Sequence, residues 1–277
     1  MTDYEHFRVR PESRVDLSKL DPAQTPGCKD KEEAAKRLER DVAALTHLQY
    51  LLYAENKRSL LIVLQALDGG GKDGTVLHVF QAFNPQSAYV HQFKVPSTLE
   101  ASHDFLWRAH AAAPARGQAA IFNRSHYEDV LTVRVHELVP KDVWSKRYDR
   151  INEFEKNLTE AGTTIVKFFL HISPEAQLAR FKKRLDDPTH QWKISESDYT
   201  ERKRWDDYMA AYETVLERCS TAHAPWYVVP ADKKWYRNLV VGGVIRETLE
   251  KMDPKTPAPT VDIERIRKQY HKAVDRA

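Results

Sequence analysis

The chain has little of the residues that mark several specialised protein classes. It contains 2 cysteines in 277 residues, Cys28 and Cys219, and they lie far apart without metal-binding or redox spacing. We therefore expect them to be buried or incidental thiols. No apolar run reaches transmembrane length, and the N-terminus has no signal-peptide core. These absences predict a cytoplasmic protein with no membrane partner.

An excess of charge of one sign is also missing. The 43 Lys and Arg residues nearly balance the 40 Asp and Glu residues, and the formal net charge is +3. We therefore predict no nucleic-acid partner, and any anion-binding surface must come from local clustering. A content of 42% hydrophobic and 30% charged residues is ordinary for a globular protein. The length of 277 residues suffices for one large α/β domain or two small ones.

Glycine is scarce as well, yet a glycine run stands between an apolar stretch, Leu60–Leu64, and Lys72. The run is Gly69, Gly70 and Gly71, and apolar spacing typical of a helix begins directly after it. Strand, glycine-rich turn, lysine and helix in this order form the P-loop arrangement. Glycines let backbone N–H groups converge on an anion, the helix N-terminus adds free donors, and the lysine adds a point charge.

The loop departs from the common pattern G-x-x-x-x-G-K-[ST] at two positions. Ala66 stands where the first glycine is expected, and Asp73 stands where the magnesium-binding Ser or Thr is expected. The alternative interpretation is a glycine-rich turn with a solvated lysine. The strand before the loop and the helix after it favour phosphate binding.

The rest of the chain alternates between strand and helix patterns. Asp30 and, three residues later, Glu33 are typical of a helix start. This alternation predicts an α/β fold: a three-layer fold like that of P-loop nucleotide kinases, with a five-stranded parallel sheet, helices on both faces and a basic helical lid. The predicted strands are 60–64, 88–93, 118–122, 163–172 and 226–229. The predicted helices are 30–56, 74–83, 98–113, 140–162, 174–186, 196–218, 238–252 and 263–274.

We predict three segments. Residues 1–29 are polar and contain prolines, so they form an irregular arm that lies on the domain or is partly disordered. Residues 30–252 form a single P-loop kinase-like domain with a lid at about 180–198. Residues 253–277 form a C-terminal tail with one short helix.

Two further stretches carry candidate chemistry. Asn123–Asp129 follows a short apolar strand, and the carboxyl ends of parallel strands are where α/β sheets bind ligands. The alternative is a charged helix start. Residues 180–193 contain five Lys or Arg against two Asp, beside the aperiodic loop 188–198. We interpret this segment as a phosphate-contacting lid, with a solvated basic face as the alternative.

Together these motifs resemble the polyphosphate kinase 2 family, and more narrowly its class III, over roughly residues 30–252. The resemblance rests on Ala66–Gly74, Phe122–Asp129 and the lid residues Arg184, Asp187-Pro188, Trp192-Lys193 and Ser195. Ala66 and Asp73 are expected residues in this family. The family often has Asp at the position of Asn123, and Asn there, with Glu128-Asp129 following Tyr127, resembles class III. The amide argues against an anionic metal ligand at this position.

The resemblance implies reversible transfer of the terminal phosphoryl group of inorganic polyphosphate to AMP or ADP, giving ADP or ATP; guanine nucleotides are further candidates. The cofactor implied is Mg²⁺, with Mn²⁺ as the alternative, and the metal ligands expected from motif position are Asp68 and Asp129. Phosphoryl transfer depends on positioning and charge neutralisation. The residues expected to carry catalysis are Asp68, Lys72, Arg124, Glu128 and Asp129.

A polyanion needs a track of cations, and we expect the loop to hold the acceptor's phosphate facing the polyphosphate end with magnesium between. The residues expected to bind phosphate and polyphosphate are Gly69, Gly70, Gly71, Lys72, Asp73, Gly74, Arg124, Arg180, Lys183, Arg184 and Lys193. The residues expected at the nucleotide are Pro96, Asp104, Arg108, Asn123, His126 and Tyr127. For His126, a packed or capping role is an equal alternative.

Two other functions remain open at this point. An ATP-dependent nucleotide kinase shares the fold, although Asp73 and the basic lid favour a polyphosphate chain. A non-catalytic nucleotide- or polyphosphate-binding module is the second alternative. The presence of Asp68, Lys72, Arg124 and Asp129 argues against it. A homodimer or homotetramer is expected from the family and from the frequency of homo-oligomers.

Overall fold

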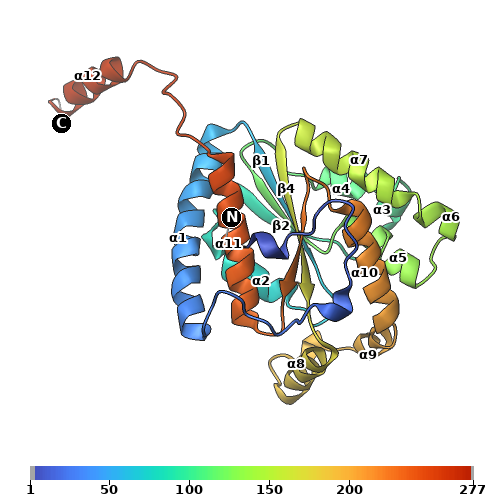
Figure 1. Ribbon diagram of the computed structural model, residues 1–277. Coiled ribbons are helices and arrows are strands. Elements are labelled where there is room, and N and C mark those ends of the chain that lie inside the picture. Colours follow the sequence, from blue (N-terminus) through green and yellow to red (C-terminus); the bar gives the residue numbers. More distant parts are fainter. Residues whose placement is uncertain (1–3, 276–277) are drawn as a thin grey trace.

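A computed structural model describes residues 4–275 of the chain. Its centre is one sheet of five parallel strands in the order β2–β3–β1–β4–β5 (Figure 1). The predicted parallel sheet is confirmed, and each predicted strand lies within one residue of its observed bounds. The strands are β1 (Ser59–Gln65), β2 (Ala88–Gln92), β3 (Ala119–Asn123), β4 (Thr163–His171) and β5 (Trp226–Pro230).

Strand β1 lies at the centre of the sheet, between β3 and β4, and all of its residues are buried. Burial on both faces requires the continuous apolar run seen in its sequence. Leu60 and Ile62 pack into the core on one face, and Leu61 and Val63 pack into the core on the other. The register pairs Leu64 with the last residue of β3. The glycine loop and the segment after β3 therefore leave the sheet side by side.

Long helices cover both faces of the sheet (Figure 1). On one face lie α1 (Lys31–Glu55), α2 (Lys72–Val79) and α11 (Lys234–Met252), and on the other lie α7 (Arg147–Glu160) and α10 (Trp205–Cys219). As predicted, the carboxylate of Asp30 caps α1 by accepting the backbone N–H of Glu33 at 2.9 Å. Helices α8 (Pro174–Asp186) and α9 (Glu196–Arg202) lie beyond the carboxyl ends of the strands.

The arm before α1 packs on the domain over its described residues, 4–29. Phe7, Val9 and Leu17 are buried. The backbone N–H of Val9 donates to the carbonyl of Trp226 at 2.9 Å, and Arg8 forms an isolated antiparallel bridge with Tyr227. The arm thus covers the outer edge of β5, where backbone groups would otherwise lack partners.

Three of the predicted helices are each broken into two. Residues 98–113 form α3 (Thr98–Ala101) and α4 (Trp107–Ala111), residues 140–162 form α6 (Lys141–Trp144) and α7, and residues 196–218 form α9 and α10. At the first break, the carboxylate of Asp104 accepts the backbone N–H of Leu106 at 3.0 Å and starts a new turn.

At the other two breaks, arginines bind backbone carbonyls across the fold. Arg218 donates to the carbonyl of Ser145 at 3.2 Å, and Arg204 donates to the carbonyl of Val135 at 3.0 Å. Apolar spacing continues through both breaks, so it could not reveal them. Tertiary hydrogen bonds outweigh the local preference for a continuous helix here.

A buried ion pair ties β4 to α7 and to the turn η4 (His126–Asp129) that follows β3. The side chains of Glu155 and Lys167 are completely buried, and their Oε2 and Nζ atoms lie 2.5 Å apart. The ammonium of Lys167 also donates to the hydroxyl of Tyr127 and the carbonyl of Cys219, each at 2.8 Å. Burial opposes ionisation of Glu155, but the charge of Lys167 and the contacts of Lys167 and His126 together outweigh it, so the pKa of that carboxyl is lowered.

The C-terminal segment stands apart from the sheet. Helix α12 (Ile263–Val274) lies at the end of an extended linker and buries none of its residues (Figure 1). None of the helices within residues 4–275 has the length and apolar character needed to cross a membrane. A further short helix is α5 (Thr132–Val135). Both cysteines are buried free thiols, as expected.

Candidate active site

The glycine loop joins β1 to α2 at the carboxyl edge of the sheet. Gly71 is the N-cap of α2 with a φ of 101°, and Gly69 has a φ of 76°. Both values lie in the left-handed region that favours glycine. A side chain at this position would also displace an arginine, because a Cβ on Gly71 would lie 1.8 Å from Nη1 of Arg237. The loop backbone thus passes in close contact with an arginine of α11.

Lys72 is the first residue of α2, and its side chain folds back over the loop. Its Nζ donates to the carbonyl of Ala66 at 2.9 Å. Burial, and then the guanidinium of Arg124, lower the pKa of Lys72, while the carboxylates of Asp68 and Asp73 oppose the shift. This ammonium is a desolvated point charge within the loop, as phosphate binding requires.

The two motifs that the sequence identified separately meet at this edge of the sheet. The guanidinium of Arg124 donates to the carboxylate of Asp68 at 2.8 Å. The amide nitrogen of Asn123 donates to the carboxylate of Asp73 at 2.8 Å. Arg124 has a φ of 60°, and its backbone N–H donates to the carbonyl of Leu64 at the end of β1. This unusual conformation turns the chain out of β3 and toward the loop.

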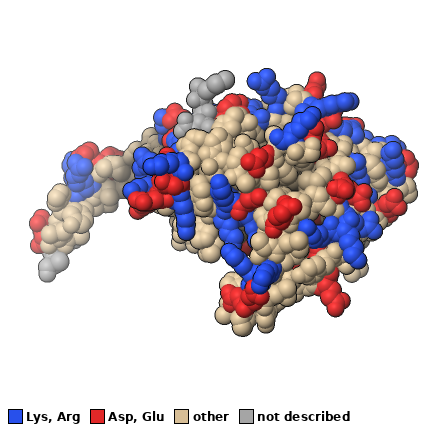
Figure 2. All heavy atoms as spheres, turned by 60° about the horizontal axis from the view of Figure 1, so that its bottom comes forward, with Lys and Arg blue, Asp and Glu red and all other residues tan. Residues whose placement is uncertain are grey.

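Five basic side chains from α8 and α11 lie beside the loop: Arg180, Lys183, Arg184, Lys234 and Arg237, here called the α8–α11 cation group. Burial lowers the pKa of Lys234, and the charges of the other four lower it further. Within residues 4–275, the group's one ion pair is a contact of 3.8 Å between Arg184 and Asp198. Figure 2 shows acidic and basic side chains mixed over the molecular face that it presents. The cation group is therefore a local feature.

One cavity of about 1220 Å³ joins the loop, the segment after β3 and the α8–α11 cation group. This volume exceeds the roughly 300–1,000 Å³ typical of small-molecule sites, so it suits an extended ligand together with a second one. The sequence-predicted residues that line the cavity are Asp68, Gly69, Gly71, Lys72, Asp73, Gly74, Asn123, Arg124, Arg180, Lys183, Arg184 and Lys193.

Residues outside the predicted set also line the cavity. They form one wall at the start of α11, with Lys234, Arg237 and Asn238, and a second wall at Phe93–Val95 after β2. Helix α11 begins at Lys234, four residues before the predicted start at 238, and Lys233-Lys234 after the last strand is the sequence signal for these cations. The second wall directly follows β2. Its place at the carboxyl end of a parallel strand is the feature that could have indicated a ligand contact.

His126 and Tyr127 do not face the cavity, and the prediction that they contact a nucleotide is wrong. Both residues have an exposed fraction of 0%. Nε2 of His126 lies 3.2 Å from Glu155, and the hydroxyl of Tyr127 donates to the same carboxylate at 2.8 Å. Burial lowers the pKa of His126, which favours the neutral ring. The packed-histidine alternative therefore describes this position.

Asp129 does not join Asp68 at the cavity, which contradicts its assignment as a metal ligand and catalytic residue. Its carboxylate is buried between two guanidinium groups, 2.9 Å from Arg147 and 3.4 Å from Arg108. Arg108 also donates to the carbonyl of Lys94 at 2.8 Å. Asp129 and Arg108 therefore hold the segment after β2 in place, and Arg108 is not presented to a nucleotide.

Three other predicted contacts also lie outside the cavity lining. Pro96 and Asp104 are exposed, and the carboxylate of Asp104 accepts the backbone N–H of Leu106 just before α4. Gly70 is buried, and its backbone N–H donates to Leu67 within the turn, so it is not directed at a ligand. At these three positions the local sequence motif does not determine whether the residue faces the cavity.

Glu128 occupies an intermediate position. Its two carboxylate oxygens accept hydrogen bonds from Gln65 at 3.0 Å and Thr132 at 2.6 Å, and it does not line the cavity. Its charge is nevertheless close enough to Lys72 and Arg124 to favour their ionised forms. Glu128 can therefore act on the loop through electrostatics, and it is not placed for direct contact with a ligand.

Two carboxylates in the cavity suit a hard divalent cation. Asp68 and Asp73 both line it, on either side of the glycines. Among the described residues, no group of three or more His, Cys, Asp or Glu side chains is arranged to hold a metal. Magnesium is commonly bound through one or two carboxylates plus substrate phosphates and water. The residues present therefore fit a magnesium ion that a phosphate ligand helps to hold.

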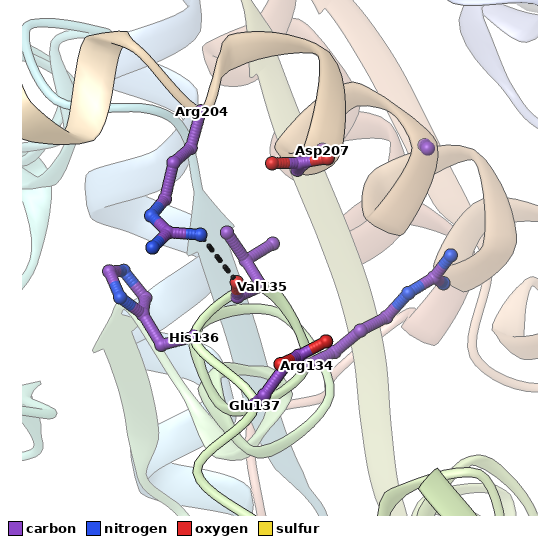
Figure 3. Close-up of a pocket in the computed structure, with 7 residues that line it drawn as sticks. Arg134, Val135, His136, Glu137, Arg204 and Asp207 are labelled. Atoms are coloured by element: carbon purple, nitrogen blue, oxygen red, sulfur yellow. Dashed lines mark hydrogen bonds between the residues drawn. The ribbon is translucent and has the colours of Figure 1, made fainter.

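A second hollow of about 330 Å³ lies between α10 and the turn after α5 (Figure 3). Arg134, His136 and Asp207 are among the residues that line it. Figure 3 shows Arg204 reaching across it to the carbonyl of Val135. None of the sequence-predicted site residues lines this hollow, and its charges are of both signs, so we do not assign it to the reaction.

Comparisons with known proteins agree with this geometry. The family model described as Polyphosphate kinase 2 matches residues 28–257. A Meiothermus ruber protein named AMP/ADP-polyphosphate phosphotransferase is 47% identical, over 94% of this chain and 98% of its own length. A Rhodopseudomonas palustris ADP-polyphosphate phosphotransferase is 45% identical, over 92% of each chain. The crystal structure of polyphosphate kinase 2 from Arthrobacter aurescens TC1 is 42% identical, with a TM-score of 0.94 over 98% of this chain and 97% of that one.

Proposed function

This chain belongs to the polyphosphate kinase 2 family, and we propose that it transfers the terminal phosphoryl group of inorganic polyphosphate to AMP or ADP. The products are ADP and ATP, and the reaction is reversible. The two alternative functions, an ATP-dependent nucleotide kinase and a non-catalytic binding module, fit less well, because the named relatives of this chain are polyphosphate phosphotransferases.

The observation that carries this proposal is the uneven distribution of charge along the cavity. Around Lys72 and Arg124, the carboxylates of Asp68, Asp73 and Glu128 balance the positive charge. On the other side of the loop, the α8–α11 cation group has few carboxylates in contact. A chain of phosphates needs several cations without competing acids, so the donor lies along α8 and α11.

The acceptor nucleotide lies on the opposite side, toward β2. Its phosphate faces the donor at the glycine loop, and the wall formed by Phe93–Val95 and Asn123 lies next to its sugar and base. Carboxyl ends of neighbouring parallel strands are the usual place for such a ligand. Phosphoryl transfer requires the attacking and leaving oxygens to be roughly in line, and binding the two ligands on opposite sides of the loop is compatible with this.

Lys72 and Arg124 stabilise the charge that spreads over the transferring phosphoryl group. Fixed cations stabilise such charge most effectively when the site is preorganised. Asp68 orients Arg124 through their contact of 2.8 Å and faces the acceptor's phosphate. A nucleotide phosphate is already ionised near neutral pH, so the reaction does not require a general base.

We propose Asp68 and Asp73 as the residues that hold Mg²⁺, with Mn²⁺ as the alternative ion. The cation supplies charge neutralisation between the two phosphates when it is bound. Asp73 thereby takes the place of the Ser or Thr of an ordinary P-loop, and its hydrogen bond from Asn123 fixes its orientation.

Several broader assignments belong to the same proposal. Residues 30–252 act as one kinase domain, and residues 180–198, which include Lys193, act as a lid over the donor. The chain works as a homodimer or homotetramer in the cytoplasm, where its nucleotide substrates are found. Guanine nucleotides are further candidate acceptors.

One incubation tests the proposed reaction. The pure protein is mixed with Mg²⁺, AMP and long-chain polyphosphate in the absence of ATP, and nucleotides are separated by anion-exchange chromatography. We expect ADP and then ATP to accumulate, and no product when polyphosphate is omitted. If neither AMP nor ADP is phosphorylated, the proposal is wrong. Product formed only when ATP replaces polyphosphate identifies an ATP-dependent kinase instead.

Replacing Asp68 with asparagine tests the metal assignment. The change keeps the size and the hydrogen bond from Arg124 but removes an anionic ligand, so we expect activity at saturating polyphosphate to fall about 10²-fold or more. Raising the Mg²⁺ concentration should recover part of the rate. Asp129→Asn is the comparison, and it should leave the Mg²⁺ dependence unchanged. A wild-type rate in soluble Asp68→Asn would refute the assignment.

A further inference from the structure

Arg237, in the first two turns of α11, is buried under the glycine loop. Its exposed fraction is 1%. A Cβ on Gly71 would lie 1.8 Å from its Nη1, and a Cβ on Gly74 would lie 3.1 Å from its Nη2. The guanidinium therefore lies against the backbone between the loop and the first turn of α2. It lines the same cavity as Lys72 and Asp68.

This guanidinium lacks a counter-charge among the described residues. Its Nε and Nη2 donate to the neutral amide oxygen of Asn238, at 3.1 and 2.7 Å. Nη1 has no hydrogen-bond partner, although it is buried. Burial, and then the charge of Arg180, lower the pKa of Arg237 to about 9. A buried guanidinium normally has a carboxylate partner, because its desolvation is costly.

The acid that acts on Arg180 is engaged elsewhere. Asp232 raises the pKa of Arg180, whereas the causes that lower the pKa of Arg237 are burial and the charge of Arg180. Its carboxylate accepts the backbone N–H and the hydroxyl of Ser173, each at 2.8 Å. Arg180 itself donates to the backbone carbonyls of Gly69, Ala231 and Asp232. The protein therefore places two arginines together without an acid between them.

We infer that the guanidinium of Arg237 is a phosphate-binding group of the glycine loop, whose counter-charge is a phosphate of the polyphosphate donor at Gly71–Gly74. This assignment deepens the proposed function and rests on it for the identity of the donor. The backbone amides of the loop and the free N–H of Nη1 then bind the same anion. Glycine at position 71 is required because any side chain would displace the guanidinium.

The assignment has a signature that a structural arginine would not produce. A charge buried without a partner destabilises the protein until its anion binds, and the bound anion stabilises the folded state by mass action. Removing the charge should therefore preserve or raise stability without ligand and should abolish most of the stabilisation by ligand. A structural arginine would show a loss of stability in both conditions.

The test uses the full chain and inorganic tripolyphosphate, in buffer with EDTA and without nucleotide. Thermal unfolding and calorimetric binding are measured for the wild type and for Arg237→Met, an apolar side chain of similar length. We expect a melting temperature without ligand equal to or above that of the wild type. We expect tripolyphosphate to bind at least about 30-fold more weakly, because a buried charged contact is lost. Arg237→Gln should behave in the same way.

Arg246→Met is the matched control, because Arg246 lies on the same helix but is paired with Asp41 at 2.8 Å and Glu250 at 2.7 Å. It should lower the melting temperature and leave tripolyphosphate affinity unchanged. Wild-type affinity in Arg237→Met overturns the inference. Failure of both Arg237 variants to fold also overturns it, since the guanidinium would then be stabilising the protein without an anion.

The result separates this inference from the proposed reaction. Tripolyphosphate binding is measured without an acceptor, so a protein that binds it through Arg237 but phosphorylates neither AMP nor ADP would refute the reaction alone. A protein that phosphorylates AMP with unchanged KM for polyphosphate in Arg237→Met would refute the role of Arg237 alone.

Discussion

Lys72→Ala is expected to lower the rate of ADP formation from AMP and polyphosphate by about 10³-fold. The ammonium of Lys72 folds back over the glycine loop, with its Nζ 2.9 Å from the carbonyl of Ala66. Burial and Arg124 lower its pKa, so it is desolvated before any ligand binds. A preorganised cation of this kind stabilises the transferring phosphoryl group more than it stabilises the bound substrates.

The loss should therefore appear mainly in kcat, measured at saturating AMP and polyphosphate. The melting temperature should stay within about 3 °C of the wild type, since the variant removes a desolvated charge and one hydrogen bond. Lys182→Ala is the matched control. Lys182 lies on α8, is exposed, pairs with Asp186 at 2.6 Å and does not line the cavity. Its removal should leave kcat unchanged, and a wild-type kcat in Lys72→Ala would refute the role of Lys72.

Glu155→Ala is expected to destabilise the protein by about 3–5 kcal/mol, because it leaves the ammonium of Lys167 buried without a carboxylate. Both side chains of this pair are fully buried, and the remaining partners of Lys167 are the hydroxyl of Tyr127 and the carbonyl of Cys219. Neither can neutralise the charge. The measurement is urea unfolding followed by fluorescence, and the melting temperature should fall by about 10 °C.

The double variant Glu155→Leu with Lys167→Met supplies the decisive comparison. It removes both charges and retains apolar volume, so it should recover most of the lost stability. Glu160→Ala, which removes an exposed partner of Lys156 at 3.8 Å on the same helix, should have no measurable effect. A stability loss below about 1 kcal/mol in Glu155→Ala would contradict this prediction. It would mean that the amine of Lys167 becomes neutral or is solvated in the variant.

The buried pair also bears on the site, because Tyr127 joins it to the turn that follows Arg124. The hydroxyl of Tyr127 contacts both Glu155 and Lys167. Arg124 has a φ of 60° and is held between this turn and β1. The ion pair therefore acts on the reaction indirectly, by fixing the segment that carries Arg124.

The sequence by itself determined the sheet and the ligand-binding edge. An apolar run such as Leu60–Leu64 can only be buried, and its alternation with helical spacing leads to a parallel sheet covered on both faces. Glycines before Lys72 and the polar segment after β3 then had to meet, because parallel strands end at one edge. Capping by Asp30 followed from local hydrogen bonding alone.

Only the tertiary structure decided which polar side chains face the ligand. Tyr127 and Asp129 share a motif with Arg124, yet a buried ion pair and two arginines from distant elements direct them away from the cavity. Arg237 shares no motif with the loop, yet the packing of α11 places it under Gly71. Spacing along the chain specifies the strand or helix, whereas the direction of a charged side chain depends on which partners packing brings to it.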